Sequence, residues 1–581
     1  MKTIYNTIKA LFIIVLSSFS YSMLAQESVN RELTLEREYD PSVQDANKVN
    51  TLPEIKEPVV SKRSIDYATF TLPTEPKREL GILPSGNIMT DIEYNKRKGY
   101  LNFGIGTYLN INADAGYHIL STDKDQLNIF FSHRSTNGNI KYLQQEGEHE
   151  KTKAKLNDNL GGVNFRHQFE QAALKLGADY GYSSFNYYGL PGASPYFYLP
   201  NERLTDETNQ INQLIKINAG VESREDATIG YLFDLDYTNF SYNYGLNKET
   251  DGITEHNVGG KLALSSSFGG NQRVGIGGKF NYFNYSLPTG DFLFENYFEG
   301  TLNPYYVVND DNWNIRLGAK VMFITGDNSK FFASPDIAAD ITVGSKTVLY
   351  LTADGDIRSN SAYQLSRENR YINPEHGVMP SRTWLDAVVG LKSGVAPGFW
   401  FNLFGGYKIT DKDYFFIPAL TYQGFANVSN TFSLNSNRLQ GGLEMTYAYQ
   451  EIFKISLKGV YNKWSVEKKE SPSSGYIPTL KYYAYGRPEM EFNAGITVRP
   501  IDNLTLGLDY YLATGRKTYV SGPENEKMKN INELNLTGSY TINDTFGAYV
   551  KLNNLLFQKY ELLYGYPLQG FNVMAGITIT F

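Results

Sequence analysis

The residues that most often carry chemistry in proteins are few in this chain, and their spacing favours neither a catalytic site nor a metal site. The chain has no cysteine, which excludes disulfide bonds and thiolate chemistry. The 6 histidines are His118, His133, His149, His167, His256 and His376. No two of them are spaced like paired metal ligands on one helical turn, and the sequence fixes no carboxylate beside any of them. We therefore predict no catalytic residues, no metal site and no cofactor, and a protein that is not an enzyme.

One glycine-rich run, Gly275-Ile276-Gly277-Gly278-Lys279, has the residue types of a phosphate-binding loop. Such a loop needs a strand that ends and a helix that begins at the glycines, because the helix N-terminus holds the phosphate. This run lies instead within a segment that alternates apolar and polar side chains. We interpret its glycines as small residues at the crowded inner face of a strand. A Gly-x-Ser-x-Gly nucleophile elbow does not occur in the sequence.

The segments that would position these side chains have the two-residue period of β-strands with two different faces. Clear examples are residues 273–282, 439–447 and 504–512. After residue 25, no apolar run reaches the roughly 18 residues that a membrane-spanning helix needs. Strands of a membrane barrel hide their apolar residues in alternation, which fits a mean hydropathy of -0.38 together with 14% aromatic residues. The sequence predicts an all-β protein, a transmembrane antiparallel β-barrel of the bacterial outer membrane.

From Tyr100 onward, short turns alternate with longer loops, as in outer-membrane barrels, whose short turns face the periplasm. The expected short turns are 122–125, 224–226, 270–271, 309–312, 344–346, 396–398 and 500–503. The expected outer loops are 137–158, 188–209, 246–255, 358–382, 410–436, 467–487 and 516–530. With 410–436 treated as one folded-over loop, the count is about 22 strands, an even number that leaves both ends of the barrel on the periplasmic side.

Aromatic residues at strand ends and in the outer loops are the best candidates for binding. They are Tyr187, Tyr188, Tyr196, Phe197, Tyr198, Tyr414, Phe415, Phe416, Tyr482, Tyr483 and Tyr485. Their rings could stack on a sugar ring or dock a surface lipoprotein. An aromatic girdle at the membrane interface explains the same positions, and we favour it for most of them.

The N-terminal region differs from the rest of the chain. Lys2 and Lys9, an apolar core and a small-residue exit before Gln26 indicate a cleaved signal peptide over residues 1–25, and hence export. Residues 26–98 are rich in charge and proline, which predicts an extended periplasmic or lumenal arm and not a folded domain. Residues 99–581 form the predicted barrel. The formal net charge of -7 argues against a nucleic-acid partner.

The last strand is expected to close the barrel. Phe571, Val573, Ile577 and Ile579 share one face of an alternating run that ends at Phe581. Closure removes the open edges that would make such an apolar strand prone to aggregation. The terminal aromatic resembles the signal read by the barrel-assembly machinery. We predict that these five residues govern assembly.

The closing hairpin resembles that of TonB-dependent receptors. The segments that carry the resemblance are Lys551-Leu552-Asn553-Asn554-Leu555-Leu556-Phe557-Gln558-Lys559-Tyr560, Gly565-Tyr566-Pro567-Leu568-Gln569-Gly570 and Phe581. The resemblance implies a barrel of this size, nutrient uptake and coupling to TonB. Members of that family carry a globular, glycine-rich plug before the barrel, whereas the arm has only Gly81 and Gly86 and roughly half the length of such a plug.

The arm points to a subgroup. The chain resembles plugless barrels of this kind that are common in Bacteroidota, and the shared arm segments are Arg37-Glu38-Tyr39-Asp40-Pro41 and Asn50-Thr51-Leu52-Pro53. Two functions therefore stay open. The closing hairpin favours a receptor or transporter of the TonB-dependent type, and the missing plug favours a structural or accessory subunit of an outer-membrane protein complex.

The expected partners follow from these alternatives. Outer-membrane lipid surrounds the barrel in both, and TonB or an outer-membrane lipoprotein is a further candidate. Leu33-Thr34-Leu35-Glu36 has a short alternating pattern that could add as a strand to a sheet edge of TonB. We also predict a closed lumen, because an empty barrel of about 22 strands would be a wide aqueous hole. The candidate stoppers are the arm over residues 26–91 and the outer loops 358–382 and 410–436.

Overall fold

The computed structural model describes residues 97–143, 151–189, 209–224, 227–246, 250–287, 294–326, 330–344, 346–418, 428–467, 481–521 and 524–581. The predicted signal peptide, the predicted arm up to residue 96 with its segment Leu33-Thr34-Leu35-Glu36, and the aromatics Tyr196, Phe197 and Tyr198 lie outside the described residues.

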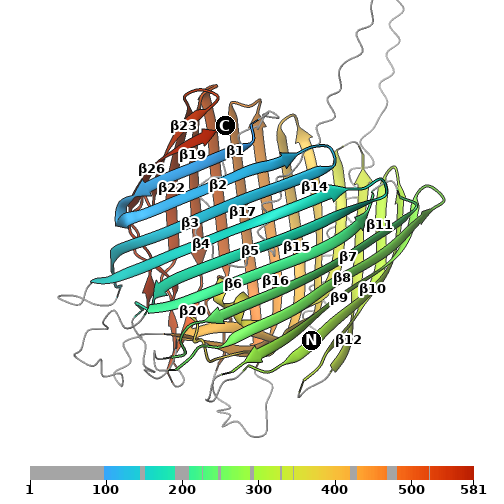
Figure 1. Cartoon of the computed structure of the whole chain (residues 1–581), viewed down its shortest axis with the longest axis horizontal. Coiled ribbons are helices and arrows are strands. Elements are labelled where there is room, and N and C mark those ends of the chain that lie inside the picture. The colour runs from blue at the N-terminus through green and yellow to red at the C-terminus, as the bar shows by residue number, and fades with distance from the viewer. Residues whose placement is uncertain are drawn as a thin grey trace, which may run out of the picture. The chain divides into compact units, whose positions relative to one another are not determined.

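The described strands build one closed antiparallel sheet of 22 strands, in which the first strand pairs with the last (Figure 1). The wall strands are β1 Gly99–Gly106, β2 Asn110–Ser121, β3 Asp125–Lys141, β4 Lys151–Gln168, β5 Ala172–Asn186, β6 Asn209–Ser223, β7 Ile229–Tyr242, β8 Thr254–Phe268, β9 Gln272–Ser286, β10 Tyr297–Asp310, β11 Trp313–Ile324, β12 Lys330–Val343, β13 Thr347–Arg358, β14 Ser381–Ala396, β15 Phe399–Pro418, β16 Ser429–Tyr449, β17 Phe453–Glu467, β18 Met490–Ile501, β19 Leu504–Thr514, β22 Ile531–Thr541, β23 Phe546–Asn553 and β26 Asn572–Thr580. The remaining described elements are η1 Thr107–Leu109, α2 Ala362–Glu368 and two small hairpins, β20 Lys517–Ser521 with β21 Glu524–Lys527 and β24 Glu561–Leu563 with β25 Tyr566–Pro567. The predicted fold class and strand number are confirmed.

The barrel closes along a seam where β1 pairs antiparallel with β26. Gly99 and Phe581 exchange two backbone hydrogen bonds, of 2.8 and 3.0 Å, at the start of this seam. Tyr549 of β23 lies over Gly104 and Gly576, because a Cβ atom on either glycine would come within 2.3 Å of an atom of its phenol group. Glycine at these two positions is therefore required by the close approach of a tyrosine.

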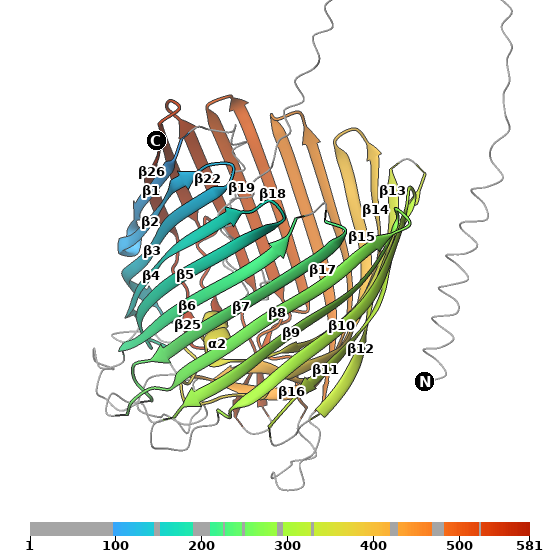
Figure 2. The same cartoon turned by 45° about the vertical axis from the view of Figure 1, so that its right-hand side comes forward.

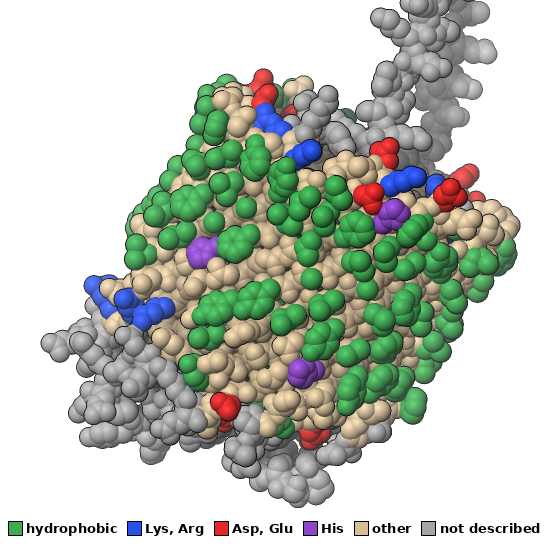
Figure 3. Space-filling model, viewed as in Figure 1, with side chains coloured by type: hydrophobic (Ala, Val, Ile, Leu, Met, Phe, Trp, Pro, Cys, Tyr) green, Lys and Arg blue, Asp and Glu red, His purple; other side chains and the backbone are tan. Residues whose placement is uncertain are grey.

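The wall strands present apolar side chains outward and polar side chains inward. In β9, for example, Val274, Ile276 and Tyr282 are exposed. Figure 3 shows apolar side chains over the outer wall, with charged side chains gathered near its two ends. The inner face carries cross-strand ion pairs such as Arg316 with Asp336, at 2.7 Å. An apolar outside and a charged inside are what a lipid-embedded barrel requires. Among the described residues, no helix is both long and apolar enough to cross a membrane.

The glycine-rich run lies within β9, as expected for a strand and not for a phosphate loop. A Cβ atom on Gly275 would lie 2.4 Å from the Tyr305 ring, so the inner face is crowded at this position. The corresponding positions on Gly277 and Gly278 have no atom closer than 3.7 Å. Crowding therefore explains Gly275 and leaves the two following glycines without a steric reason.

The two ends of the barrel differ. The short turns, the start of β1 and the end of β26 lie at one end of the barrel, called here the short-turn end. The longer connections lie at the other, called the long-loop end (Figures 1 and 2). The expected loop 137–158 is shorter than predicted, because β3 continues to Lys141 and β4 begins at Lys151.

The prediction that 410–436 is one folded-over loop is wrong. β15 continues to Pro418, and β16 begins at Ser429 and pairs with it along this extension. A register shift after Thr410, with Lys412 at a positive φ of 53°, interrupts the alternation locally before pairing resumes. Because the extension lengthens two wall strands and adds none, the strand count is unaffected.

Candidate functional site at the long-loop end

The connection between β13 and β14, residues 359–380, is called here the inner loop, and it contains the helix α2. The side chain of Ser361 caps this helix by accepting a hydrogen bond of 3.3 Å from the backbone N–H of Gln364. Ala362 and Leu365, one turn apart on the helix, are 1% and 0% exposed. They belong to a cluster of buried apolar side chains that includes residues of the wall from β7 to β15. The helix is thus held by burial of one face, since seven residues are too few to be stable alone.

The first residues of the inner loop are bonded to β8 and β10. The Tyr297 hydroxyl donates to the Ser359 carbonyl oxygen at 2.6 Å, and the Ser359 hydroxyl donates to Glu299 at 2.6 Å. Glu255 of β8 accepts a hydrogen bond of 3.3 Å from the backbone N–H of Tyr363. Both carboxylates are buried, at 1% and 3% exposed, and these bonds give each of them a hydrogen-bond partner.

The middle of the inner loop reaches β4, which lies nine strands from β13 in the sheet order. Arg370 donates to the carboxylate of Asp158 through both terminal nitrogens, at distances of 3.1 to 3.3 Å. The Tyr371 ring stacks on the ring of Tyr566 in β25, with centroids 3.9 Å apart. In a closed sheet, one loop can contact both β10 and β4 only by crossing the bore, and Figure 2 shows α2 and β25 near this end of the barrel.

Backbone hydrogen bonds join the inner loop to β16 as well. Ile372 forms a parallel bridge with Ser429. The Asn373 N–H donates to the Ser429 carbonyl oxygen at 2.8 Å, and the Ser429 N–H donates to the Tyr371 carbonyl oxygen at 2.9 Å. The carboxylate of Glu375 accepts a hydrogen bond of 2.8 Å from the backbone N–H of Leu246. The loop is therefore fixed at several well-separated places around the wall.

The electrostatic state of the inner loop follows from its burial. Burial alone would lower the pKa of Arg370, but the adjacent Asp158 carboxylate raises this pKa above its ordinary value. Burial raises the pKa of Tyr371 and lowers the pKa of His376. At neutral pH the loop thus meets the far wall through a charged arginine and a neutral phenol.

A second connection, residues 554–571 between β23 and β26, covers the neighbouring part of the same end. It carries the hairpin β24–β25, and the Tyr188 hydroxyl donates to the Pro567 carbonyl oxygen at 2.9 Å. The Tyr560 hydroxyl donates to Glu533 of β22. Tyr188 and Tyr566 also make an edge contact with centroids 5.1 Å apart. Tyr371 of the inner loop packs against the same cluster, so the two connections share it.

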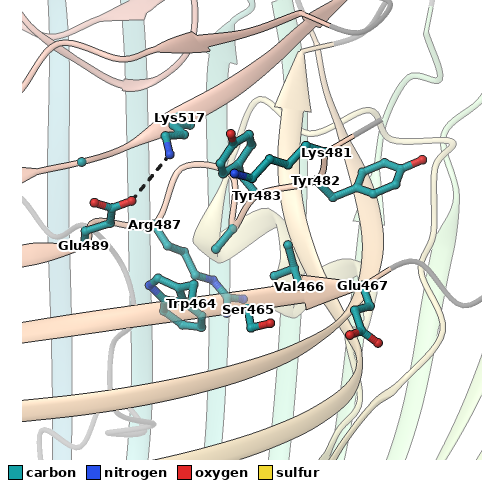
Figure 4. Close-up of a pocket in the computed structure, with 12 residues that line it drawn as sticks. Trp464, Ser465, Val466, Glu467, Lys481, Tyr482, Tyr483, Arg487, Glu489 and Lys517 are labelled. Carbon is teal, nitrogen blue, oxygen red and sulfur yellow. Dashed lines mark ion pairs between the residues drawn. The ribbon is translucent and has the colours of Figure 1, made fainter. Parts of the chain in front are cut away.

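A cavity of about 670 Å³ lies at the long-loop end beside β17 and β20 (Figure 4). It is lined by Trp464, Ser465, Val466, Glu467, Lys481, Tyr482, Tyr483, Ala484, Arg487, Glu489, Gly515 and Lys517. The Lys517 ammonium lies 3.9 Å from the centroid of the Tyr483 ring and 3.6 Å from the Glu489 carboxylate. Aromatic rings and charged groups that face one cavity suit a polar ligand with flat surfaces.

The arginine of this cavity is held in a buried ion pair. Arg487 donates to both carboxylate oxygens of Asp413 in β15, at 2.7 and 2.8 Å, and to the Tyr414 carbonyl oxygen at 2.9 Å. Its guanidinium lies between the rings of Phe415 and Trp464, 4.3 and 5.0 Å from their centroids. Across the described residues, no three His, Cys, Asp or Glu side chains are grouped to hold a metal ion.

The described aromatics that the sequence proposed for binding fall into three groups. The buried group, at most 6% exposed, is Tyr187, Tyr188, Tyr414, Phe415 and Tyr485. Phe416 is partly buried against the cluster around α2, and Tyr482 and Tyr483 line the cavity. The rings of the buried group pack on other protein groups.

The residues proposed for assembly lie along the seam. Ile577 and Phe581 are exposed, Val573 and Ile579 are partly exposed, and the Phe571 ring packs on Phe557 with centroids 4.9 Å apart. The residues that bind the inner loop to the wall, Arg370 and Asp158 above all, had no role in the sequence interpretation. The available signal was the helix cap and apolar spacing of residues 361–368 within an expected outer loop.

Comparison with known proteins shows which solved structures share this barrel fold. No family model and no curated protein matches the sequence. Among solved structures, the chain is similar to the ferric enterobactin receptor PfeA of Pseudomonas aeruginosa, with a TM-score of 0.60, 10% identity, and coverage of 84% of this chain and 81% of that one. It is also similar to the ferric-catecholate import receptor Fiu of E. coli K12, with a TM-score of 0.58, 10% identity, and coverage of 84% and 82%. The copper transporter OprC gives a TM-score of 0.58, 11% identity, and coverage of 84% and 81%. At these identities the similarity shows a shared barrel fold alone.

Proposed function

We propose that this chain is an outer-membrane receptor barrel that recognises a ligand at the cell surface and takes it up. The observation that carries the proposal is the closed barrel, which resembles import receptors and a transporter over 84% of the chain. Its apolar outer wall fits a lipid bilayer, and short turns at one end fit the periplasmic side of such barrels. The long-loop end would then face outward, with the cavity accessible to ligands outside the cell.

The cavity supplies the recognition chemistry in this proposal. Trp464, Tyr482 and Tyr483 offer aromatic surfaces, and Lys481 and Lys517 offer ammonium groups next to them. This combination favours a ligand with a planar or ring-shaped part and polar substituents. Ferric enterobactin and copper are the ligands of the similar structures. We propose uptake as a class of activity and assign neither ligand to this chain.

The test is to isolate the protein gently from its own outer membrane and to identify retained small molecules by mass spectrometry. Wild type should retain a compound that a Trp464→Ala, Tyr483→Ala variant loses. A matched control is Trp313→Ala, because Trp313 lies at the short-turn end where β11 begins. If neither protein retains a compound, and a protein partner co-purifies in fixed proportion, the uptake proposal is wrong.

Energy coupling is a further part of the proposal. Export by a cleaved signal peptide would leave Leu33-Thr34-Leu35-Glu36 near the start of the mature chain, where it could add as a strand to TonB. Purified TonB periplasmic domain should capture the wild-type protein, and Leu35→Pro should prevent this because proline lacks the backbone donor. Failure to capture the wild type would end this part of the proposal.

A second candidate function is a structural or accessory subunit of an outer-membrane protein complex. It agrees with our proposal that the chain belongs with the plugless barrels of Bacteroidota, and one observation favours it. The inner loop packs against the wall at the long-loop end with buried side chains, including Leu365 and Ile372, and a barrel whose bore is crossed by its own loop is less suited to conduct. The co-purification experiment separates the two candidates, since a subunit would carry a stoichiometric partner and no small molecule.

A further inference from the structure

We propose that the inner loop, residues 359–380, is a gate. It seals the bore at the long-loop end, and it opens by releasing β4, β15, β16 and β25 while its attachment to β8 and β10 is retained. The gate itself is independent of the proposed function, whereas its control by the cavity, argued below, depends on that function.

The seal follows from where the loop is attached. Its contacts lie on β10 and β8, on β16, and on β4 and the β24–β25 hairpin, so they are spread around the wall and not confined to one side. The residues at its core are buried: Leu365, Asn369 and Ile372 are at most 2% exposed. A barrel of this width holds an aqueous channel unless something fills it, and a packed loop across the bore fills it.

The far attachment is the weaker one. Arg370 and Asp158 are 33% and 31% exposed, and partly exposed ion pairs contribute little to stability because water competes for both groups. The Tyr371 ring stacks on Tyr566 of another loop, and it meets Phe185 of β5 in an edge contact. These contacts can be lost without opening the sheet.

A further attachment is built on β15. Glu368, the last residue of α2, accepts a hydrogen bond of 2.5 Å from the Tyr414 hydroxyl and forms an ion pair with Arg358. Tyr414 in turn is fixed through its carbonyl oxygen by Arg487, which also binds the buried Asp413. The attachment that remains when the gate opens is the one to β8 and β10, because it rests on the buried carboxylates of Glu255 and Glu299.

The cavity and the gate share this attachment. Arg487 lines the cavity, and it contacts Asp413 and Tyr414, which are neighbours in β15. A ligand that binds Arg487 therefore acts on the strand that holds α2. This connection gives the proposed uptake site a physical route to the seal, and it can be tested as a coupling between the two.

The test is the conductance of the purified full-length protein in a planar lipid bilayer. Wild type should be almost always closed. Asp158→Asn keeps the size of the side chain but removes the charge that holds Arg370, and it should raise the open probability about fivefold, the factor that corresponds to loss of one weak ion pair. Glu222→Gln is the matched control. Glu222 of β6 pairs with Arg166, which belongs to the same strand β4 as Asp158 but lies at the short-turn end, so this variant should leave the open probability unchanged.

A disulfide lock identifies the moving part. The chain has no cysteine, and Ile372 and Ser429 are bridge partners within disulfide reach. In the Asp158→Asn background, Ile372→Cys with Ser429→Cys should abolish openings when oxidised, and reduction should restore them. Migration as a heat-modifiable barrel checks that each variant is folded. An Asp158→Asn protein that remains as closed as wild type, or openings that persist in the oxidised lock, would overturn the proposal.

Tyr414→Phe separates the gate from the uptake function. It removes the hydroxyl bonded to Glu368 and leaves the cavity lining intact, so openings should become more frequent while any retained small molecule stays bound. If no small molecule is found, the uptake function fails and the gate stands on the conductance results. If gating is unaffected by Tyr414→Phe, the control by the cavity is wrong.

Discussion

Replacing Asp413 by asparagine tests whether the buried ion pair holds the extension of β15 and β16 beyond the register shift. Asp413 accepts hydrogen bonds from Arg487 at 2.7 and 2.8 Å and from the Ser436 hydroxyl at 2.5 Å. The Asp413 side chain is 4% exposed and the Arg487 side chain 19%. Removing one charge of a buried pair costs about 3–5 kcal/mol. We expect about 3 kcal/mol from this range, because Arg487 is partly exposed and keeps its bond to the Tyr414 carbonyl oxygen.

Amide hydrogen exchange of the purified barrel measures this effect locally. The free energy of opening for residues 413–418 and 429–434 should fall in Asp413→Asn, so that these amides exchange roughly 150-fold faster. The further change Arg487→Met removes the stranded cation and should recover part of the loss. Glu451→Gln is the control, since Glu451 is 78% exposed and pairs with Arg499 at 3.6 Å, where no measurable change is expected. Exchange at the wild-type rate in Asp413→Asn, or a double variant no more protected than the single one, would refute the argument.

Three further predictions concern the seam and the lumen. Gly104→Ala places a Cβ 2.3 Å from the Tyr549 hydroxyl and should lower the temperature at which the folded barrel resists SDS; adding Tyr549→Leu should restore it, since the next atom, the Met574 sulfur, is 3.2 Å away. Deleting Phe581 removes two backbone hydrogen bonds to Gly99 and a ring contact with Tyr117, and it should lower the amount of heat-modifiable barrel in the outer membrane; a normal amount would contradict the assembly role. A variant without residues 26–91 should stay closed in the bilayer if the inner loop is the seal, whereas large openings would assign closure to the arm.

The wall of this barrel was largely predictable from sequence because its signal is local. In β9, Val274, Ile276 and Tyr282 alternate with small and polar residues, and lipid on one side and the lumen on the other impose that period on each strand. The extension of β15 was missed for the same reason, since the register shift at Asp411 and Lys412 interrupts the alternation that sequence reasoning follows. Pairing resumes beyond the register shift because β16 supplies a partner, and the sequence of β15 alone does not contain this information.

The site was less predictable because its contacts are distant in sequence. Arg370 and Asp158 are separated by more than two hundred residues, and no periodicity relates an arginine in a loop to a carboxylate nine strands away. The candidate aromatics were expected at the outer surface, but Tyr187, Tyr414 and Tyr485 are buried because the loops that carry them fold against one another. A loop that packs inward has the same composition as one that faces water.

The seam is also the lowest part of the barrel wall. β1 has 8 residues and β26 has 9, whereas β15 and β16 have 20 and 21. At about 3.4 Å per residue, the seam strands are about as long as the roughly 30 Å hydrocarbon layer is thick, and the longest strands are more than twice their length. Separating two strands means breaking their hydrogen bonds, so less work is needed to part β1 from β26 than to part β15 from β16. A strand of another protein that inserts into this wall would meet less resistance at that seam, where the first and last wall strands meet, than between β15 and β16.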